Sequence, residues 1–233
     1  MASTARTPSS CASRPLWSGS ITGVELLTGA QVEAFEGADR VERVRLADGR
    51  LVETDFVVAG VGVLPRTALA ERAGISVDNG ILVDQRLETS APGVFAVGDV
   101  ANAFHPFYDD RLRVEHWANA LNQPATAAKA MLGKEASYER LPYFFSDQYD
   151  VGMEYSGHAA SWDEVVFRGD PSEREFIAFW LAHGRVVAGM NVNVWDVTAP
   201  IQELIRSRRV VDARRLSDPE VALDELAGIE AVA

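Results

Sequence analysis

The sequence predicts an α/β fold followed by a small α+β domain with an antiparallel sheet. Short apolar runs bounded by glycine, proline and asparagine turns occupy the first part of the chain, as in residues 94–97 after the Pro92-Gly93 turn. From about Leu141 the pattern changes to alternating strands of six or so residues. At 233 residues the chain is long enough to bury a core in one large domain or two small ones.

Composition and charge exclude several classes of function. Hydrophobic residues make up 47% and charged residues 24% of the chain, as in an ordinary globular protein. The formal net charge of −12 argues against nucleic acid as a partner, because binding phosphates needs a positive face. No apolar stretch approaches the roughly 20 residues that span a bilayer, so we expect no membrane partner. The single cysteine, Cys11, excludes an internal disulfide framework and fits a reducing cytoplasm.

Residues 1–20 differ in composition from the rest of the chain. They are rich in serine, alanine and threonine, and they contain two arginines and no acid. This bias is typical of a transit peptide, although the apolar core of a secretory signal is missing. We interpret the segment as the product of an alternative or out-of-frame start, with targeting as the second interpretation.

The segment from residue 21 to about 72 is predicted to be rich in strands. Residues 24–27 and 32–35 read as short strands, and residues 41–46 and 51–53 form a hairpin around an Asp48-Gly49 turn. Residues 55–59 are an apolar run that ends at Gly60, which predicts a buried strand of a parallel sheet.

The segment from residue 75 to 133 is predicted to hold a turn, a strand and a helix. Residues 78–80 form a tight turn, and residues 94–97 form the strand that ends at Gly98-Asp99. The spacing of Ala125, Ala128 and Leu132 predicts a helix that packs closely on a sheet and ends at Gly133. Pro124 either kinks this helix or lies in its first turn.

The last segment is predicted to form an antiparallel sheet with two helices. The expected strands cover residues 151–155, 164–167, 175–181 and 185–190, and a helix covers 199–207. Residues 217–220, Ser-Asp-Pro-Glu, resemble a capping box that starts a last helix through Leu226.

Asp99 is the strongest candidate for a functional residue. A buried strand that delivers a carboxylate to the edge of a sheet needs hydroxyl or amide partners for that charge. A chain of sugar-like hydroxyls would supply them. A strand that simply ends at a solvated Gly-Asp turn explains the same residues equally well.

The run of residues 89–99, T-S-x-P-x-V-F-A-V-G-D, resembles the second flavin motif of the two-nucleotide flavoprotein reductases. The resemblance extends from about Gly23 to about Gly189 and is strongest to ferredoxin reductases of the putidaredoxin-reductase or rhodocoxin-reductase type. It implies that Gly98 and Asp99 bind FAD, with the Asp99 carboxylate on the ribityl chain.

Three further positions carry the same resemblance. Residues 115–120 resemble an E-x-W-x-N-A segment, which implies that Trp117 borders the flavin ring and Glu115 lies near the nicotinamide. Without the resemblance, Trp117 is better read as a core aromatic. Phe145 stands where the family's P-x-x-W-S-D-Q segment has a tryptophan, so stacking is retained over a smaller area. Gly62 belongs to a loop that the resemblance places near NAD(P), although a plain strand-to-loop exit also explains it.

The resemblance also implies that this chain is a fragment. The chain has no G-x-G-x-x-G loop, and the family carries two such loops upstream of the matching region. The fold would then be a remnant of two Rossmann-like domains, for FAD and NAD(P), followed by a small reductase domain. The implied segments are a leader at 1–20, the end of the NAD(P)-binding domain at 21–72, the returning FAD-binding segment at 73–140 and the carboxyl-terminal domain at 141–233.

The implied activity is electron transfer from NAD(P)H through FAD to a ferredoxin-like iron–sulfur protein. A cluster of arginines could dock an acidic ferredoxin, or it could be a solvated helix end balanced by Asp212 and Glu203; its members are Arg206, Arg208, Arg209, Arg214 and Arg215. The implied cofactors are FAD and NAD(P)H, and the fragment alone is expected to be inactive.

Other functions remain open from the residues. A disulfide reductase is disfavoured because no His-Pro-x-x-x-Glu segment occurs near the carboxyl end. An inactive fragment, or a module that forms a homodimer through its carboxyl-terminal sheet, is the non-enzymatic alternative. The four histidines at positions 105, 116, 158 and 183 show no metal-ligand spacing and read as solvated or loop residues.

Overall fold

The computed structural model describes residues 24–228, so the predicted leader lies outside the described residues. The chain divides into two compact units between Gly62 and Val63, and each is described by itself. No helix within residues 24–228 combines the length and apolar character needed to cross a membrane.

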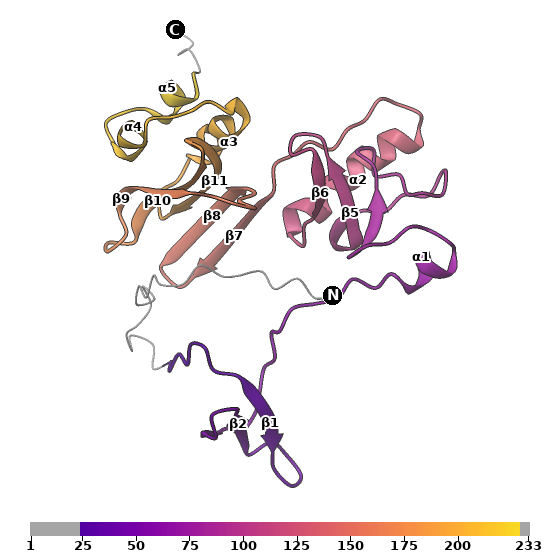
Figure 1. Cartoon of the computed structure of the whole chain (residues 1–233), viewed down its shortest axis with the longest axis vertical. Coiled ribbons are helices and arrows are strands. Elements are labelled where there is room, and N and C mark those ends of the chain that lie inside the picture. The colour runs from indigo at the N-terminus through magenta and orange to yellow at the C-terminus, as the bar shows by residue number, and fades with distance from the viewer. Residues whose placement is uncertain (1–23, 229–233) are drawn as a thin grey trace. The chain divides into compact units, whose positions relative to one another are not determined.

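The first unit contains a small antiparallel sheet of three strands in the order β1-β2-β3. The strands are β1 (Val32–Glu36), β2 (Arg43–Leu46) and β3 (Leu51–Glu53) (Figure 1). The predicted hairpin around Asp48-Gly49 is confirmed, with the Leu46 amide bonded to the Arg50 carbonyl at 2.9 Å. The strand expected at residues 24–27 is absent from the structure. Leu46 is the one buried strand residue in this sheet.

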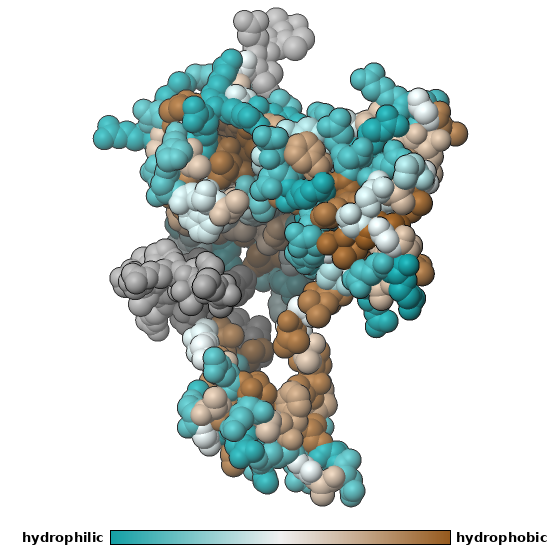
Figure 2. Space-filling view, turned by 45° about the vertical axis from the view of Figure 1, so that its right-hand side comes forward, coloured by the Kyte–Doolittle hydropathy of each residue, from teal (hydrophilic) through white to brown (hydrophobic). Residues whose placement is uncertain are grey.

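The prediction of a buried strand at residues 55–59 is wrong. These residues have no regular structure, and Phe56 and Val58 are 74% and 84% exposed. A strand forms only where at least one neighbouring strand bonds its backbone, and no described strand pairs with this run. Figure 2 shows the apolar side chains of the segment that follows the hairpin lying on the surface.

The first part of the second unit is a three-stranded mixed sheet in the order β4-β5-β6. Its elements are α1 (Ala68–Arg72), β4 (Ile81–Val83), the 3₁₀ helix η1 (Gly98–Val100), β5 (Ala101–His105) and β6 (Asp110–Arg113). β4 and β5 are parallel, and β5 and β6 are antiparallel. The turn at residues 78–80 is confirmed by a 2.9 Å bond from the Asp78 amide to the Gly80 carbonyl.

The prediction of a strand at residues 94–97 is wrong. Only Phe95 makes a β-bridge, to Glu88, and the Ala96 amide bonds to the Leu87 carbonyl at 3.1 Å. The apolar residues of this run are held by a neighbouring loop rather than by a sheet. They still help to close a core with Val83, Leu87 and Ala101.

Helix α2 (Trp117–Met131) begins eight residues before the predicted stretch, so Pro124 lies inside it and not in its first turn. Proline has no amide hydrogen, and the Ala120 carbonyl therefore lacks its usual helical partner. The predicted packing face is wrong: Ala125, Ala128 and Leu132 are exposed. The buried face carries two amides and two alanines, Asn119, Gln123, Ala127 and Ala130. The predicted stop is confirmed, since Gly133 follows the helix end with φ +70°.

The last part of the chain is a five-stranded antiparallel sheet in the order β7-β8-β11-β10-β9. The strands are β7 (Tyr143–Gln148), β8 (Val151–Gly157), β9 (Glu164–Asp170), β10 (Glu175–Ala182) and β11 (Arg185–Val192). The four predicted strands are confirmed, and β7 is an addition. Its sequence shows no strict alternation, because β7 lies at an edge and only part of each face is covered.

Three helices cover one face of this sheet (Figure 1). They are α3 (Thr198–Ser207), α4 (Ala213–Ser217) and α5 (Leu223–Ala227). Together with β9, β10 and β11 they enclose the largest core, which contains Phe179, Leu204 and Leu216, each at 0% exposure. α3 confirms the helix predicted at 199–207.

The predicted capping box at residues 217–220 is wrong. Ser217 ends α4, and its hydroxyl donates to the Arg214 carbonyl at 2.9 Å. The cap in this region is Asp212, whose carboxylate accepts the Arg214 amide at 2.8 Å and starts α4. The last helix begins later, at Leu223.

Candidate functional site

The Gly98-Asp99 turn is held against the amino-terminal half of α2. The Gly98 amide donates to Gln123 Oε1 at 2.7 Å, and both residues are buried. Gly98 has φ +75°, a conformation that strains any side-chain-bearing residue. Its backbone lies close to Ala120, so the turn and the helix form one rigid element. Asp99 follows in η1 with its side chain exposed rather than at the end of a buried strand.

Arg113 connects this turn to Glu115. The Arg113 guanidinium donates to the Asp99 carbonyl oxygen at 3.2 Å, and it also pairs with the Glu115 carboxylate. The arginine side chain is only 13% exposed, whereas that of Glu115 is 36% exposed. The structure therefore brings Asp99 and Glu115 to the same place. Arg113 was missed by the sequence analysis, although a basic residue two positions before the predicted acid Glu115 is a signal that could have been used.

Trp117 is the first residue of α2, and its side chain is 69% exposed. The reading of Trp117 as a core aromatic is wrong. His116, at the N-cap position, makes no side-chain hydrogen bond to the first turn of α2. No described group accepts a hydrogen bond from the backbone amides of Trp117 and Ala118. The positive end of the dipole of this 15-residue helix, with its unbonded amides, therefore lies two residues after Glu115.

Phe144, not Phe145, is the β7 aromatic that contacts His116, the residue before α2. The Phe144 ring lies 4.7 Å from the His116 ring and stacks on Tyr155 at 5.1 Å. Phe145 points to the opposite face of the strand, as successive strand residues do, and is 52% exposed. Burial lowers the pKa of His116, so its imidazole is neutral at pH 7. The contact of Phe144 with His116 is separate from the stacking role that the resemblance implies for Phe145, which stays a prediction.

Gly62 belongs to the first unit, where it has φ +87° and no atom near the position of a β-carbon. Its role beside NAD(P) stays a prediction.

His158 and His183 are exposed, as predicted, whereas His105 and the arginines differ from the sequence-based interpretation. His105 is 4% exposed, and its Nε2 lies 2.9 Å from the Arg140 carbonyl, so it is neither solvated nor in a loop. Burial lowers its pKa. Within residues 24–228 no cluster of three potential metal ligands occurs. The ion pairs of the described residues do not join the arginine cluster to Asp212 or Glu203; Arg215 pairs with Glu225 instead.

Two arginines of this cluster are fixed by backbone carbonyls. Arg206 Nη2 donates to the Glu139 carbonyl at 3.0 Å, and Arg208 donates to the Phe107 carbonyl while its guanidinium lies 4.5 Å from that ring. Arg209 and Arg214 are exposed and make no side-chain contact of this kind in the described structure.

Comparison with known proteins identifies the family. Residues 20–124 match the family model "Pyridine nucleotide-disulphide oxidoreductase", and residues 143–227 match the model "Reductase C-terminal". The chain is a relative of the ferredoxin reductases. It is 41% identical over 207 residues to a probable ferredoxin reductase, CtmF, of Castellaniella defragrans, covering 88% of this chain and 51% of that protein. It is 36% identical to the putidaredoxin reductase CamA of Pseudomonas putida, covering 88% and 49%.

Solved structures give the same result. The ferredoxin reductase for the CYP199A2 system from Rhodopseudomonas palustris superposes with a TM-score of 0.81 at 33% identity, over 85% of this chain and 50% of that one. The covalent putidaredoxin reductase–putidaredoxin complex superposes with a TM-score of 0.81 at 34% identity, over 88% and 50%. The chain thus spans about half the length of the reductases that it matches, which confirms the resemblance to a part of a ferredoxin reductase.

The geometry at residues 98–117 is compatible with part of a flavin site. Asp99 presents an exposed carboxylate that no described side chain engages, and such a group accepts hydroxyl hydrogens. The open amides of Trp117 and Ala118 favour a group that becomes negatively charged. The residues present therefore fit FAD on its ribityl and ring side.

Proposed function

We propose that the protein containing these residues transfers electrons from NAD(P)H through FAD to a ferredoxin-like iron–sulfur protein. One observation carries the proposal: the Gly98-Asp99 turn, Glu115 and the open end of α2 are joined into one cluster by Gln123 and Arg113. The relatives named ferredoxin reductases support it, as does the relative named a ferredoxin–NAD(P)⁺ reductase.

Each residue of the cluster would have a distinct role. Asp99 would accept a ribityl hydroxyl of FAD, and the α2 amides at Trp117 would face the pyrimidine edge of the ring. FAD would supply the chemistry, by accepting a hydride and releasing single electrons. Glu115, oriented by Arg113, would lie where a nicotinamide arrives, and Phe145 would offer an exposed ring for stacking. Gly62 would belong to the NAD(P) side.

The proposal is tested by supplying the missing part of the site. The chain alone carries neither glycine-rich loop, so we expect it to purify without flavin and to reduce no artificial acceptor with NAD(P)H. The amino-terminal half of the putidaredoxin reductase of P. putida, fused ahead of residue 24, should restore flavin absorbance near 450 nm and NAD(P)H-dependent reduction.

A fusion that folds but retains no FAD would contradict the proposal. Folding is checked by circular dichroism and by a single elution peak at the expected mass. Stoichiometric flavin on the chain alone would contradict its reading as a fragment.

The acceptor is tested with arginines whose side chains donate to no backbone carbonyl in the described structure. Arg206 and Arg208 bond to backbone carbonyls, so their replacement would damage the fold; Arg209 and Arg214 are the suitable positions. In the fusion, Arg209→Gln with Arg214→Gln should slow reduction of an acidic ferredoxin and flatten its dependence on salt, because exposed charges are screened beyond about 8–10 Å at 0.1–0.15 M. Reduction of a small neutral acceptor should be unchanged, and Arg72→Gln is the control at an exposed arginine of α1. Equal rates with ferredoxin for the double variant would exclude this docking surface.

We further propose a cytoplasmic protein that forms a homodimer. A single cysteine supports a reducing compartment. β9 is an edge strand whose Val165 and Phe167 are 36% and 46% exposed, which supports pairing through this sheet. Light scattering of the fusion distinguishes a monomer from a dimer.

A further inference from the structure

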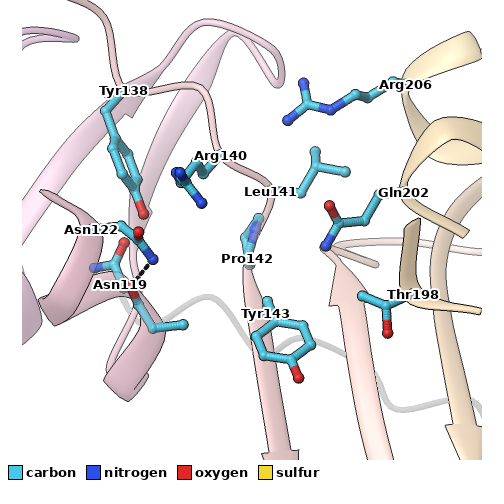
Figure 3. A pocket seen from close by; sticks show the side chains of 11 residues that line it. Asn119, Asn122, Tyr138, Arg140, Leu141, Pro142, Tyr143, Thr198, Gln202 and Arg206 are labelled. Atoms are coloured by element: carbon cyan, nitrogen blue, oxygen red, sulfur yellow. Dashed lines mark hydrogen bonds between the residues drawn. The ribbon is translucent and has the colours of Figure 1, made fainter. Parts of the chain in front are cut away.

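A cavity of about 510 Å³ lies between α2 and α3, beside the segment that joins α2 to β7 (Figure 3). Its polar lining residues are Asn119 and Asn122 of α2, Tyr138 and Arg140 of the connecting segment, Tyr143 at the start of β7, and Thr198, Gln202 and Arg206 of α3. The cavity lies within the second unit and has a volume typical of small-molecule sites.

The charge of this cavity is positive. Arg140 and Arg206 both line it, and no aspartate or glutamate does. Neither arginine forms an ion pair with any acid in residues 24–228, in a chain whose net charge is −12. Two unpaired guanidinium groups over one cavity repel each other, and an anion between them would remove that repulsion.

Hydrogen bonds hold the side chain of Arg206 and the main chain of Arg140. Arg206 donates to the Glu139 carbonyl at 3.0 Å, and the Arg140 carbonyl is bonded to the buried His105 ring at 2.9 Å. In Figure 3 Arg140 lies to the left of Leu141 and the Arg206 guanidinium lies above it. The charge of Arg140 acts to lower the pKa of Tyr138 against the larger effect of burial, so this charge reaches the cavity wall.

The other end of the cavity offers hydrogen-bond acceptors. Asn119 donates its amide to the Val114 carbonyl at 3.0 Å, and Asn122 donates to the Ala118 carbonyl at 2.7 Å. These bonds orient both side chains and leave their amide oxygens to accept hydrogens from a ligand. Asn119 is 7% exposed, so a ligand hydroxyl would meet it away from bulk water.

We propose that this cavity binds a small phosphate ester that carries hydroxyl groups. The phosphate would lie between Arg140 and Arg206, where guanidinium groups can donate paired hydrogen bonds, and the hydroxyls would donate to Asn119 and Asn122. The cavity adjoins the Asp99 cluster at Ala118, but its arginines and asparagines are not part of that cluster, so this proposal does not depend on flavin binding.

The test measures binding by the full chain with three probes: ribose 5-phosphate, inorganic phosphate and ribose. By calorimetry, ribose 5-phosphate should bind more tightly than inorganic phosphate, and ribose alone should not bind. Arg140→Gln should weaken ribose 5-phosphate binding by about 10- to 150-fold, the range for one charge-assisted hydrogen bond. Asn122→Leu should weaken ribose 5-phosphate but leave inorganic phosphate unchanged.

Arg72→Gln, at an exposed arginine of α1 outside the cavity, is the matched control and should bind as the unmodified chain does. Circular dichroism confirms the fold of each variant, and Arg140→Lys, which keeps the charge, should retain part of the affinity. Lack of binding by ribose 5-phosphate would overturn the proposal. So would equal affinity in Arg140→Gln, or an equal loss in Arg72→Gln.

Discussion

The hairpin unit and the carboxyl-terminal sheet contain similar strand-forming sequences but bury them very differently. In the hairpin unit one strand residue is buried, and the apolar run that follows has no regular structure. In the five-stranded sheet, β10 alone buries five residues, with α3, α4 and α5 covering one face. The difference shows that an apolar run becomes a strand only where neighbouring strands and a covering layer are present.

The largest predicted effect contrasts two phenylalanines. Phe179 is at 0% exposure in β10, and Phe56 is 74% exposed. Phe179→Ala should lower the free energy of unfolding of the second unit by about 3–5 kcal/mol, because it removes buried area and leaves a cavity. Phe56→Ala, in the first unit, should change the free energy of unfolding of that unit by less than about 0.5 kcal/mol. Urea denaturation followed by circular dichroism measures both, and comparable losses would show that residues 55–59 are packed in solution.

The second prediction concerns Asp99, which the second unit presents for FAD under the proposed function. Asp99 is exposed, so Asp99→Ala should leave the unfolding of the chain alone unchanged. In the fusion it should weaken FAD retention about 10- to 150-fold, equivalent to about 1.5–3 kcal/mol for a charge-assisted hydrogen bond. Titration with FAD measures the affinity, and Asp109→Ala in an exposed loop is the control. Equal FAD affinities for Asp99→Ala and the unmodified fusion would show that Asp99 does not bind FAD.

The sequence predicted the carboxyl-terminal sheet well because its signal is local. Turn residues separate strands that pair with their sequence neighbours, as β10 does with β9 and β11. It failed at residues 55–59 and 94–97, where the same apolar pattern depends on partners far away. The sequence also failed to predict the buried face of α2, which carries Asn119 and Gln123. Gln123 can be buried because its side chain accepts a hydrogen bond from the Gly98 amide, and hydrophobic periodicity cannot reveal such a partner.

The candidate site was predicted through the motif rather than through geometry. Asp99, Glu115 and Trp117 lie together, but the contacts that join them come from Arg113 and Gln123. Neither residue belongs to the quoted motifs. Side chains that connect a site across 14 to 25 positions leave no local pattern in a single sequence.

The third prediction concerns a polar network inside the carboxyl-terminal domain. Glu154 accepts hydrogen bonds from Tyr143 at 2.6 Å and from Asn191 and Thr198 at 2.9 Å. Burial raises the pKa of Glu154, but these three bonds outweigh it and hold the pKa below its ordinary value of 4.5. The same contact and burial raise the pKa of Tyr143 to about 12. The charged Glu154 therefore stabilises the fold above about pH 4.5, and this contribution is lost as pH falls through the lowered pKa.

Glu154→Gln should therefore lower the free energy of unfolding at pH 7 by about 1–2 kcal/mol. The difference should shrink as the pH is lowered from 5 to 3, where the unmodified carboxyl becomes protonated. Glu164→Gln, at an exposed position of β9, is the control. A difference between Glu154→Gln and the unmodified chain that stays constant over this pH range would contradict the network.

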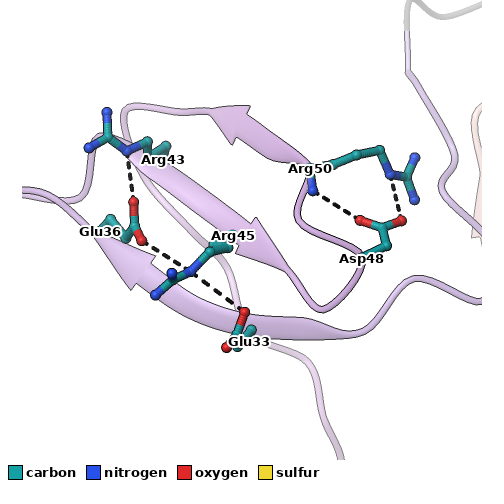
Figure 4. Close-up of polar contacts among 6 residues, drawn as sticks. All are labelled: Glu33, Glu36, Arg43, Arg45, Asp48 and Arg50. Carbon is teal, nitrogen blue, oxygen red and sulfur yellow. Dashed lines mark hydrogen bonds and ion pairs between the residues drawn. The ribbon is translucent and has the colours of Figure 1, made fainter.

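The smallest predicted effect is in the hairpin unit, which relies on exposed ion pairs where the other region has a core. Arg43 Nε lies 2.8 Å from Glu36 Oε2, and Arg45 Nε lies 3.1 Å from Glu36 Oε1 (Figure 4). The hydrogen bond from Arg43 is the main cause that lowers the pKa of Glu36, so the pairs are formed above the ordinary value of 4.5 and are lost as pH falls below it. Salt screens exposed pairs, and their contribution is small in water.

Arg43→Gln should therefore speed amide hydrogen exchange in β1 and β2 only modestly at low salt, and not at all in 1 M NaCl. Arg50→Gln tests the separate pair with Asp48 at the turn and should act only on amides next to Gly49. A large and salt-independent change in β1 would mean that the three-stranded sheet is held by packing, and that the two regions differ less than their burial indicates.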